Sequence, residues 1–272
     1  MTRAMLHAAG VDVRFGGVHA LRDVTISVRP GEICGLIGPN GAGKTTLFDV
    51  LSGIRRPDGG HITFAEEDIT RRSPVWRARH GIRRTFQRQQ LFGQLTVTDN
   101  LVVAQDWRGG LRPGTRRHRE RAAAVLRECG LDALTDAYAG ALPVGQARMV
   151  ELARALADPP RVLLLDEPAS GTTADERRRL AAVVRHMAEE ENCAVLLVEH
   201  NVPFVMELCS RVVVLDLGRV LAEGTASEVR ADPAVREAYL GTSPGTSPAT
   251  SPDASPDDSP GASPDAAECE ED

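Results

Sequence analysis

Three uninterrupted runs of apolar residues predict buried strands. They cover residues 33–37, 162–165 and 194–198. Runs of this length without polar interruption are typical of inner strands of a parallel sheet, because both faces of such a sheet are covered. After the first run, apolar residues from Thr45 to Leu51 follow helical spacing until Gly53 ends the helix. The pattern therefore predicts an α/β protein built on a mixed or parallel sheet.

Other parts of the chain predict elements that surround this sheet. Apolar and polar residues alternate over residues 5–30, which indicates a small antiparallel β layer. Over about residues 87–158 the spacing turns helical and predicts a helical insert. Its amphipathic helices are expected at 116–129 and 146–157, and a hairpin is expected at 212–222.

The end of the chain differs from the rest in composition. From Ser243 to Pro264 the dipeptide Ser-Pro recurs every four residues, six times. Residues 242–272 contain eight acidic and no basic side chains, and almost nothing apolar. We therefore expect a folded domain over 1–241 and a disordered, solvated acidic tail over 242–272. A solubilising role is the simplest interpretation, and a docking or phosphorylation role is the alternative.

Composition limits the compartment and the class of protein. The longest apolar stretches are far shorter than the roughly 18 residues that a bilayer-spanning helix needs. The first five residues lack the apolar segment of a secretory signal. Five cysteines without close pairs argue against both a disulfide framework and a zinc site. We expect a chain that does not cross a membrane unaided and that works in a reducing cytoplasm.

One stretch of the chain is rich in arginine. A solvated face is the expected interpretation, since surface charge is the commonest role of arginine. The two aromatic residues of this stretch, Trp76 and Phe86, do not alternate with the arginines, so we expect no nucleic acid partner. The stretch comprises Arg71, Arg72, Arg77, Arg79, Arg83, Arg84 and Arg88.

The only lysine among the 32 basic residues closes a glycine-rich run. A glycine, four residues and Gly-Lys-Thr form the phosphate-binding loop pattern, here between a predicted strand and a predicted helix. Backbone N–H groups of such a loop converge on an anion, and the Thr45 hydroxyl suits a Mg²⁺ ion. A strand-helix turn that binds nothing is the alternative. The candidate nucleotide-binding residues are Gly38, Pro39, Asn40, Gly41, Ala42, Gly43, Lys44, Thr45 and Thr46.

Acidic and polar residues follow the other predicted strands. Asp166 and Glu167 come directly after the second apolar run, where ligands of parallel sheets bind. Asp166 suits a magnesium shell, and Glu167 suits a base for an attacking water. His200 follows the third run, and the Gln87 amide is a candidate ligand of magnesium or of a water. Taken singly, an acidic turn, a surface histidine and a lone glutamine carry little information.

In this order, these residues resemble the ATP-binding subunit of ABC transporters. The resemblance covers residues 5–240 and includes Phe15 and the predicted helix start at Gly145 and Gln146. It implies a P-loop ATPase core in which Phe15 stacks on adenine, with Mg²⁺ held by Thr45, Gln87 and Asp166. Gln87 would link that ion to a transport subunit, and His200 would contact the terminal phosphate. It also implies a head-to-tail dimer with each ATP between the Lys44 loop and the partner's Gly145 helix start.

Segments outside the shared motifs resemble the ATPases of branched-chain amino acid importers. These are residues 13–17, 86–87, 91–92, 95–97, 100–101 and 232–241. The resemblance implies a peripheral subunit at the cytoplasmic face of the cell membrane, with a second ATPase, permease subunits and an extracytoplasmic solute-binding protein as partners. ATPases serving urea, amides or lipopolysaccharide export share several of these segments. A soluble ABC ATPase without a permease, and a weakly active partner in a heterodimeric transporter, are the alternatives.

Two departures from the family pattern affect these expectations. The usual Leu-Ser-x-Gly-Gln signature is here Leu142 to Gln146, with Pro143 at the position of the serine. Because proline has no hydroxyl, we expect weakened ATP-driven dimerisation through the loss of roughly 1.5–3 kcal/mol per hydrogen bond to phosphate. The stretch from Ala169 to Asp175 also replaces the usual Gly-Leu-Asp or Gly-Leu-Asn, which is expected to alter communication between the two sites.

Overall fold

The computed structural model describes residues 3–106 and 116–240, in which a central sheet carries the candidate site. The strand order of this sheet is β10-β9-β3-β8-β7-β6, and all neighbours are parallel except β9 and β10. Its strands are β3 (Ile33–Ile37), β6 (Ile82–Arg84), β7 (Val162–Asp166), β8 (Ala194–Val198), β9 (Arg211–Asp216) and β10 (Arg219–Gly224). The predicted mixed sheet is therefore confirmed.

The apolar runs have no polar positions because both faces of the sheet are covered. In β7, Val162 and Leu164 enter one hydrophobic core, whereas Leu163 and Leu165 enter the other. The same alternation holds along β3, β8 and β9. Since each buried aliphatic side chain contributes about 1.5–3 kcal/mol, these strands anchor the two layers on either side.

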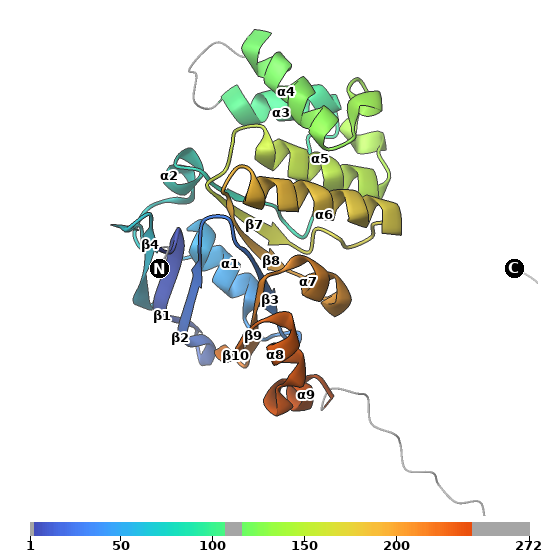
Figure 1. The fold of residues 1–272 in the computed structure, drawn as a ribbon. Coiled ribbons are helices and arrows are strands. Elements are labelled where there is room, and N and C mark those ends of the chain that lie inside the picture. Colours follow the sequence, from blue (N-terminus) through green and yellow to red (C-terminus); the bar gives the residue numbers. More distant parts are fainter. Residues whose placement is uncertain (1–2, 107–115, 241–272) are drawn as a thin grey trace, which may run out of the picture. The chain divides into compact units, whose positions relative to one another are not determined.

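A second, antiparallel sheet covers one face, with the order β2-β1-β4-β5. It contains β1 (Leu6–Phe15), β2 (Val18–Val28), β4 (Gly59–Phe64) and β5 (Glu67–Asp68). Helix α1 (Lys44–Ser52) lies between the two sheets (Figure 1) and contributes Leu47 and Phe48 to the core that they share. The helix after the predicted phosphate loop is thus held on both sides.

Helices form the other layer and the helical insert, which Figure 1 shows in green and yellow above the sheet. Within the insert, α3 packs on α4 and both pack on α5, whose first residues are the signature region. The helices are α2 (Pro74–Arg79), α3 (Val97–Asp106), α4 (Arg116–Glu128), α5 (Val144–Leu156), α6 (Ala174–Glu189), α7 (Val202–Leu208), α8 (Ala226–Ala231) and α9 (Pro233–Leu240). The expected helices at 116–129 and 146–157 correspond to α4 and α5.

The expectation of a solvated arginine face is wrong for three of the seven arginines. Arg77 is only 1% exposed, and the side chains of Arg83 and Arg84 are 12% and 7% exposed. Each is buried because it meets a partner from a distant segment: Arg77 bonds carbonyls of α1, Arg83 pairs with Asp158, and Arg84 pairs with Asp49. The density of arginines in the sequence gave no indication of these partners.

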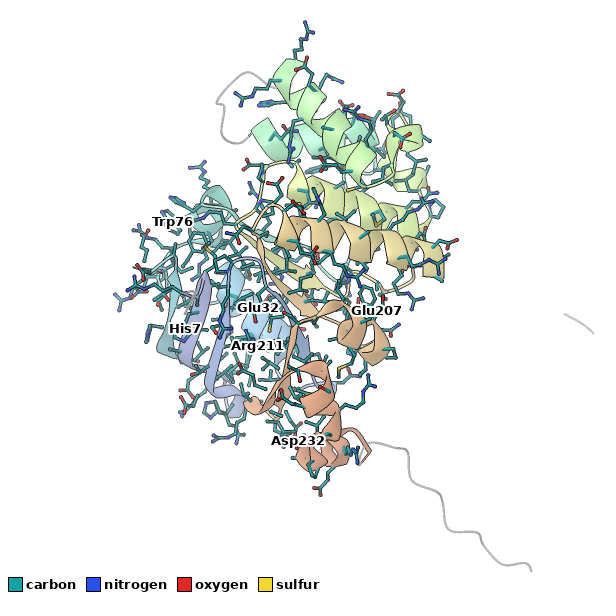
Figure 2. All side chains as sticks on the ribbon, viewed as in Figure 1. His7, Glu32, Trp76, Glu207, Arg211 and Asp232 are labelled. Atoms are coloured by element: carbon teal, nitrogen blue, oxygen red, sulfur yellow. The ribbon has the colours of Figure 1, made fainter. Side chains whose placement is uncertain are left out.

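A further, partly buried arginine joins the two sheets. Arg211 at the start of β9 donates to Glu32 at 2.7 Å, and Figure 2 labels this pair where the chain enters β3. Arg211 also donates to Glu223 of β10 at 2.6 Å and to the Ser27 carbonyl of β2. These bonds secure the sheet edge opposite the helical insert.

Some expectations concern residues outside the described part of the chain. The tail at 242–272, including Cys269, lies there, so its disorder remains a prediction. The other four cysteines are buried and free, and burial raises the pKa of Cys34, Cys129 and Cys193 to about 12. Within the described ranges, no helix has both the length and the apolar character needed to cross a bilayer.

Candidate functional site

The glycine-rich loop turns the chain from β3 into α1 in a way that requires glycine. Gly43 caps α1 with a φ of 105°, and a Cβ there would lie 2.7 Å from the Ala20 carbonyl oxygen. A Cβ at Gly38 would lie 2.0 Å from the Leu215 carbonyl oxygen. The first turn of α1 contains no acidic side chain and no side chain caps its N-terminus. Its positive end is therefore free to attract an anion.

The Lys44 side chain folds back over this loop. Its Nζ donates to the carbonyls of Gly38 and Pro39, at 2.6 and 2.9 Å, and the residue is 7% exposed. Burial lowers the pKa of Lys44, and the nearby charges of Glu167 and Asp166 oppose that shift. The ammonium thus lies in a loop whose geometry suits an anion, with two carboxylates close by.

A cavity of about 250 Å³ brings the loop together with three other predicted residues. Gln87, Glu167 and His200 line it, although they come from three different segments of the chain. They meet because β6, β7 and β8 are parallel, so that the residues after each strand reach the same edge of the sheet. The loop residues that line this cavity are Asn40, Gly41, Ala42, Gly43, Lys44, Thr45 and Thr46.

Glu167 is at the centre of the polar contacts in this cavity. His200 Nε2 lies 2.7 Å from one carboxylate oxygen, and Gln87 Nε2 donates to the other at 3.2 Å. Glu167 also has a φ of 50°, in the left-handed region that costs a residue with a side chain about 1 kcal/mol or more. Its N–H donates to the Val198 carbonyl at 2.9 Å, which holds this conformation.

Asp166 is the last residue of β7, directly before Glu167, and is 4% exposed. One of its oxygens accepts from Arg84 Nη2 at 3.1 Å, and Arg84 also donates to Asp49 of α1 at 2.6 Å. Burial raises the pKa of Asp166, whereas the hydrogen bond and charge of Arg84 lower it. Arg84 was not among the predicted site residues, because the arginine-rich stretch around it was interpreted as a surface.

Glu199 is a second residue that sequence reasoning missed. It is 4% exposed and accepts from the N–H groups of Ala169 and His200, at 2.7 and 3.2 Å. Burial raises the pKa of Glu199, and these backbone donors oppose the shift. The carboxylate therefore ties the chain after β7 to the chain after β8. Its position at the end of a buried strand, beside His200, was the available signal.

Three of the predicted binding residues come from segments outside both this loop and the lining of the cavity. Phe15 is 49% exposed at the end of β1, and the Arg55 guanidinium lies 3.8 Å from the centre of its ring. Gly145 and Gln146 are in the first turn of α5, whose N-cap is Pro143 without a side-chain cap. These three predicted binding residues do not line the cavity that contains Lys44.

The altered stretch after Glu167 packs beside the start of α5. Its Thr173 caps α6 in a reciprocal arrangement with Glu176, and Gly171 approaches Val144. A Cβ on Gly145 would lie 2.1 Å from the Glu176 carboxylate. A side chain at this position would therefore displace the Glu176 carboxylate from its capping contacts.

The site can be compared with known proteins on this basis. The family model described as "ABC transporter" matches residues 21–170, which include the loop, Gln87 and the Asp166-Glu167 pair. The chain belongs to the ABC transporter family. It is an ATP-binding subunit of that family and an ATPase, as the resemblance implied. A second model, described as "Branched-chain amino acid ATP-binding cassette transporter", matches residues 219–244 of this ABC ATPase.

Individual relatives cover nearly the whole ABC ATPase. The high-affinity branched-chain amino acid transport ATP-binding protein BraF of Pseudomonas aeruginosa is 39% identical, over 89% of this chain and 99% of BraF. The lipopolysaccharide export system ATP-binding protein LptB of Escherichia coli is 35% identical, over 88% of this chain and 98% of LptB. The structure is similar to the ADP conformation of the ATP-binding cassette MJ1267, with a TM-score of 0.81 and 31% identity over 88% and 100% of the two chains.

Proposed function

We propose that this ABC ATPase hydrolyses ATP with Mg²⁺ in a dimer and energises the import of branched-chain amino acids or similar polar small solutes through separate permeases. The observation that carries this proposal is the contact of Glu167 with both Gln87 and His200, in the cavity lined by the Lys44 loop. A carboxylate, an amide and an imidazole are thereby gathered beside a loop whose N–H groups suit a phosphate.

The residues fit a magnesium ion that is held largely by the phosphates. Within the described part of the chain, no three acidic, histidine or cysteine side chains form a metal cage. Mg²⁺ in nucleotide sites is commonly bound through only one or two carboxylates, and phosphate oxygens and waters supply most of its other ligands. Thr45 at the start of α1, Asp166 and Gln87 are the proposed ligands. The ion would neutralise charge on the phosphates.

Each polar residue then has a distinct role. Lys44 releases the two loop carbonyls that it contacts and turns to the phosphates, while the N–H groups of the loop bind the phosphate oxygens. Glu167 accepts the proton of the attacking water, and His200 contacts the terminal phosphate. Each Glu167 oxygen takes part in one contact, with Gln87 or with His200, and keeps a second lone pair, with which it can accept the proton of the water.

A second ATPase subunit completes the site in this proposal. Gly145 and Gln146 do not line the chain's own cavity, which supports a role for them towards the ATP of a partner, and Phe15 is available for adenine at its exposed ring. Pro143 cannot donate a hydroxyl, so the positive end of α5 and the Gly145 N–H remain the attractive groups there.

The cargo is inferred from the relatives. BraF is named for branched-chain amino acid transport, and the C-terminal match at residues 219–244 favours that cargo over the lipopolysaccharide export of LptB. We accordingly propose a peripheral subunit at the cytoplasmic face of the cell membrane, with permeases and an extracytoplasmic solute-binding protein as its partners.

Two experiments test this proposal. The first captures the tagged chain from detergent-solubilised native membranes and identifies the proteins that come with it. The second measures leucine uptake in cells that carry only the Glu167→Gln variant. We expect two multispanning permeases among the captured proteins, and loss of uptake in the variant cells. Capture without any membrane protein would overturn the transporter assignment in favour of a soluble ATPase. Permeases with normal leucine uptake would overturn the cargo.

A further inference from the structure

The segment that carries Gln87 belongs to no helix or strand. It runs from the end of β6 at Arg84 to the start of α3 at Val97. A segment of this kind has no ladder or helical bonds for its backbone N–H and C=O groups, which must find other partners when water is excluded. The partners of residues 86–90 therefore determine where the Gln87 backbone lies.

Side chains of α5 supply those partners. Arg148 donates to the Phe86 carbonyl at 2.9 Å and, through its other terminal nitrogen, to the Gln87 carbonyl. Glu151 accepts from the Gln90 N–H at 2.6 Å, and Arg154 donates to the Gln90 carbonyl. Both ends of residues 86–90 are thus bonded to the same helix.

The three side chains form one row along α5. They are spaced three residues apart, so neighbours in the row lie on adjacent turns of the helix. Arg148 contacts Glu151 at 3.1 Å, and their side chains are 10% and 3% exposed. Burial raises the pKa of Glu151, opposed by the Gln90 N–H and by Arg148. Hydrogen bonds to charged groups are stronger than those between neutral groups, and the burial of this pair limits competition from water.

This row joins two parts of the proposed site. At one end of α5 lie Val144 and Gly145, and Gln89 Nε2 contacts the Val144 carbonyl at 3.5 Å. Beyond the row, the Gln87 side chain reaches Glu167 at 3.2 Å. Since α5 is one continuous helix of 13 residues, a displacement of its start carries the row with it.

We propose that Arg148, Glu151 and Arg154 are positioning residues for Gln87. They attach residues 86–90 to α5, so that Gln87 and the first turn of α5 move together. A partner's nucleotide that binds at Gly145 then shifts Gln87 and alters its contact with Glu167 in the same chain. The consequence for hydrolysis rests on the proposed function, whereas the attachment of the loop to α5 does not.

A role in general stability makes a different prediction. If the row only stabilised the fold, its loss would lower the stability of the whole domain and accelerate exchange of all core amides together. A positioning role predicts a local change, confined to residues 86–90, with nucleotide affinity retained and turnover reduced. These outcomes are separable in the full-length chain.

Amide hydrogen exchange tests the attachment directly. We would compare wild type with Arg148→Ala, Arg148→Lys and Glu151→Gln, using Arg178→Lys on the exposed surface of α6 as the matched control. Because Arg148 orients the Glu151 carboxylate that accepts from the Gln90 N–H, we expect roughly 10- to 100-fold faster exchange of that N–H in Arg148→Ala. The Lys variant should show a smaller increase, and amides of α1 and β7 should stay near their wild-type rates.

The second readout is kinetic. Arg148→Ala should lower kcat for ATP about ten-fold, with the affinity for a fluorescent ATP analogue changed less than about two-fold. Unchanged exchange at residues 86–90, or equal acceleration across the whole core, would overturn the proposal. A variant with faster exchange at residues 86–90 but a wild-type kcat would also overturn it. The exchange measurement needs no hydrolysis, so an inactive wild type would refute the proposed function while exchange still decides the attachment.

Discussion

Replacing Arg77 by methionine tests how the helix that carries Lys44 is held in place. Arg77 donates to the carbonyls of Val50 and Leu51 at 2.7 Å each, in the last turn of α1. It also donates to the Ile69 carbonyl at 2.7 Å. Methionine fills part of the same space but donates no hydrogen bond, and only the Val50 and Ile69 carbonyls keep another donor, the N–H groups of Gly53 and Arg72.

The magnitude follows from two opposing effects. Three hydrogen bonds to a charged group contribute about 1.5–3 kcal/mol each. The opposing effect is desolvation: burial lowers the pKa of Arg77 from 12.5 to about 10, although the charge of Asp68 works against this shift. A shift of this size corresponds to a cost of roughly 3 kcal/mol for keeping the guanidinium charged in the folded protein. The bonds prevail, and we expect Arg77→Met to lower the free energy of unfolding by about 3 kcal/mol.

Urea unfolding of the full-length chain, followed by circular dichroism, measures this loss. For a domain of this size, about 3 kcal/mol corresponds to a fall in Tm of roughly 6–12 °C. Arg71→Met is the matched control, because Arg71 is exposed in the same arginine-rich stretch. Arg77→Lys should fall between them, since one ammonium cannot reach carbonyls on both sides as a guanidinium does. A loss below about 1 kcal/mol, or one equal to that of the control, would refute the reasoning.

Three other substitutions have defined outcomes. Lys44→Arg should weaken binding of a fluorescent ATP analogue about ten-fold or more, because the larger guanidinium cannot occupy the ammonium's place in the loop; unchanged affinity would contradict this role. Gly145→Ala should cost about 1–3 kcal/mol in urea unfolding, since its Cβ meets the Glu176 carboxylate at 2.1 Å, and adding Glu176→Ala should recover part of the loss. Pro143→Ser should strengthen ATP-driven dimerisation in sedimentation experiments by about 1.5–3 kcal/mol per site, whereas an unchanged dimer would make Pro143 neutral.

The parts of the fold that follow local rules were accessible from sequence. Strand β3 and the loop after it were predicted because apolar spacing and glycine positions are read over a few residues. Glu167 and His200 were expected to converge because each follows a predicted strand of one parallel sheet, whereas Gln87 was a candidate through its amide chemistry and the family resemblance. The cavity brings these three residues together at the edge of that sheet.

The roles of the buried charges were not accessible in the same way. Arg77 and Arg84 look like their exposed neighbours in sequence, and only the folded chain brings Arg84 to Asp166, 82 residues away. The same holds for Glu151, whose partner Gln90 lies 61 residues earlier. No period or local motif encodes such pairs, since their burial depends on which helices and strands meet.

Phosphate release by the purified chain, compared with that of Glu167→Gln, tests the central claim most directly. We predict Mg²⁺-dependent hydrolysis of ATP by the wild type and a fall of at least about 100-fold in the variant, because the amide cannot accept the proton of water. Affinity for ATP should be retained, since the Lys44 loop is untouched. Hydrolysis at the wild-type rate by the variant would contradict the assignment of Glu167 as the base and, with it, this account of the cavity.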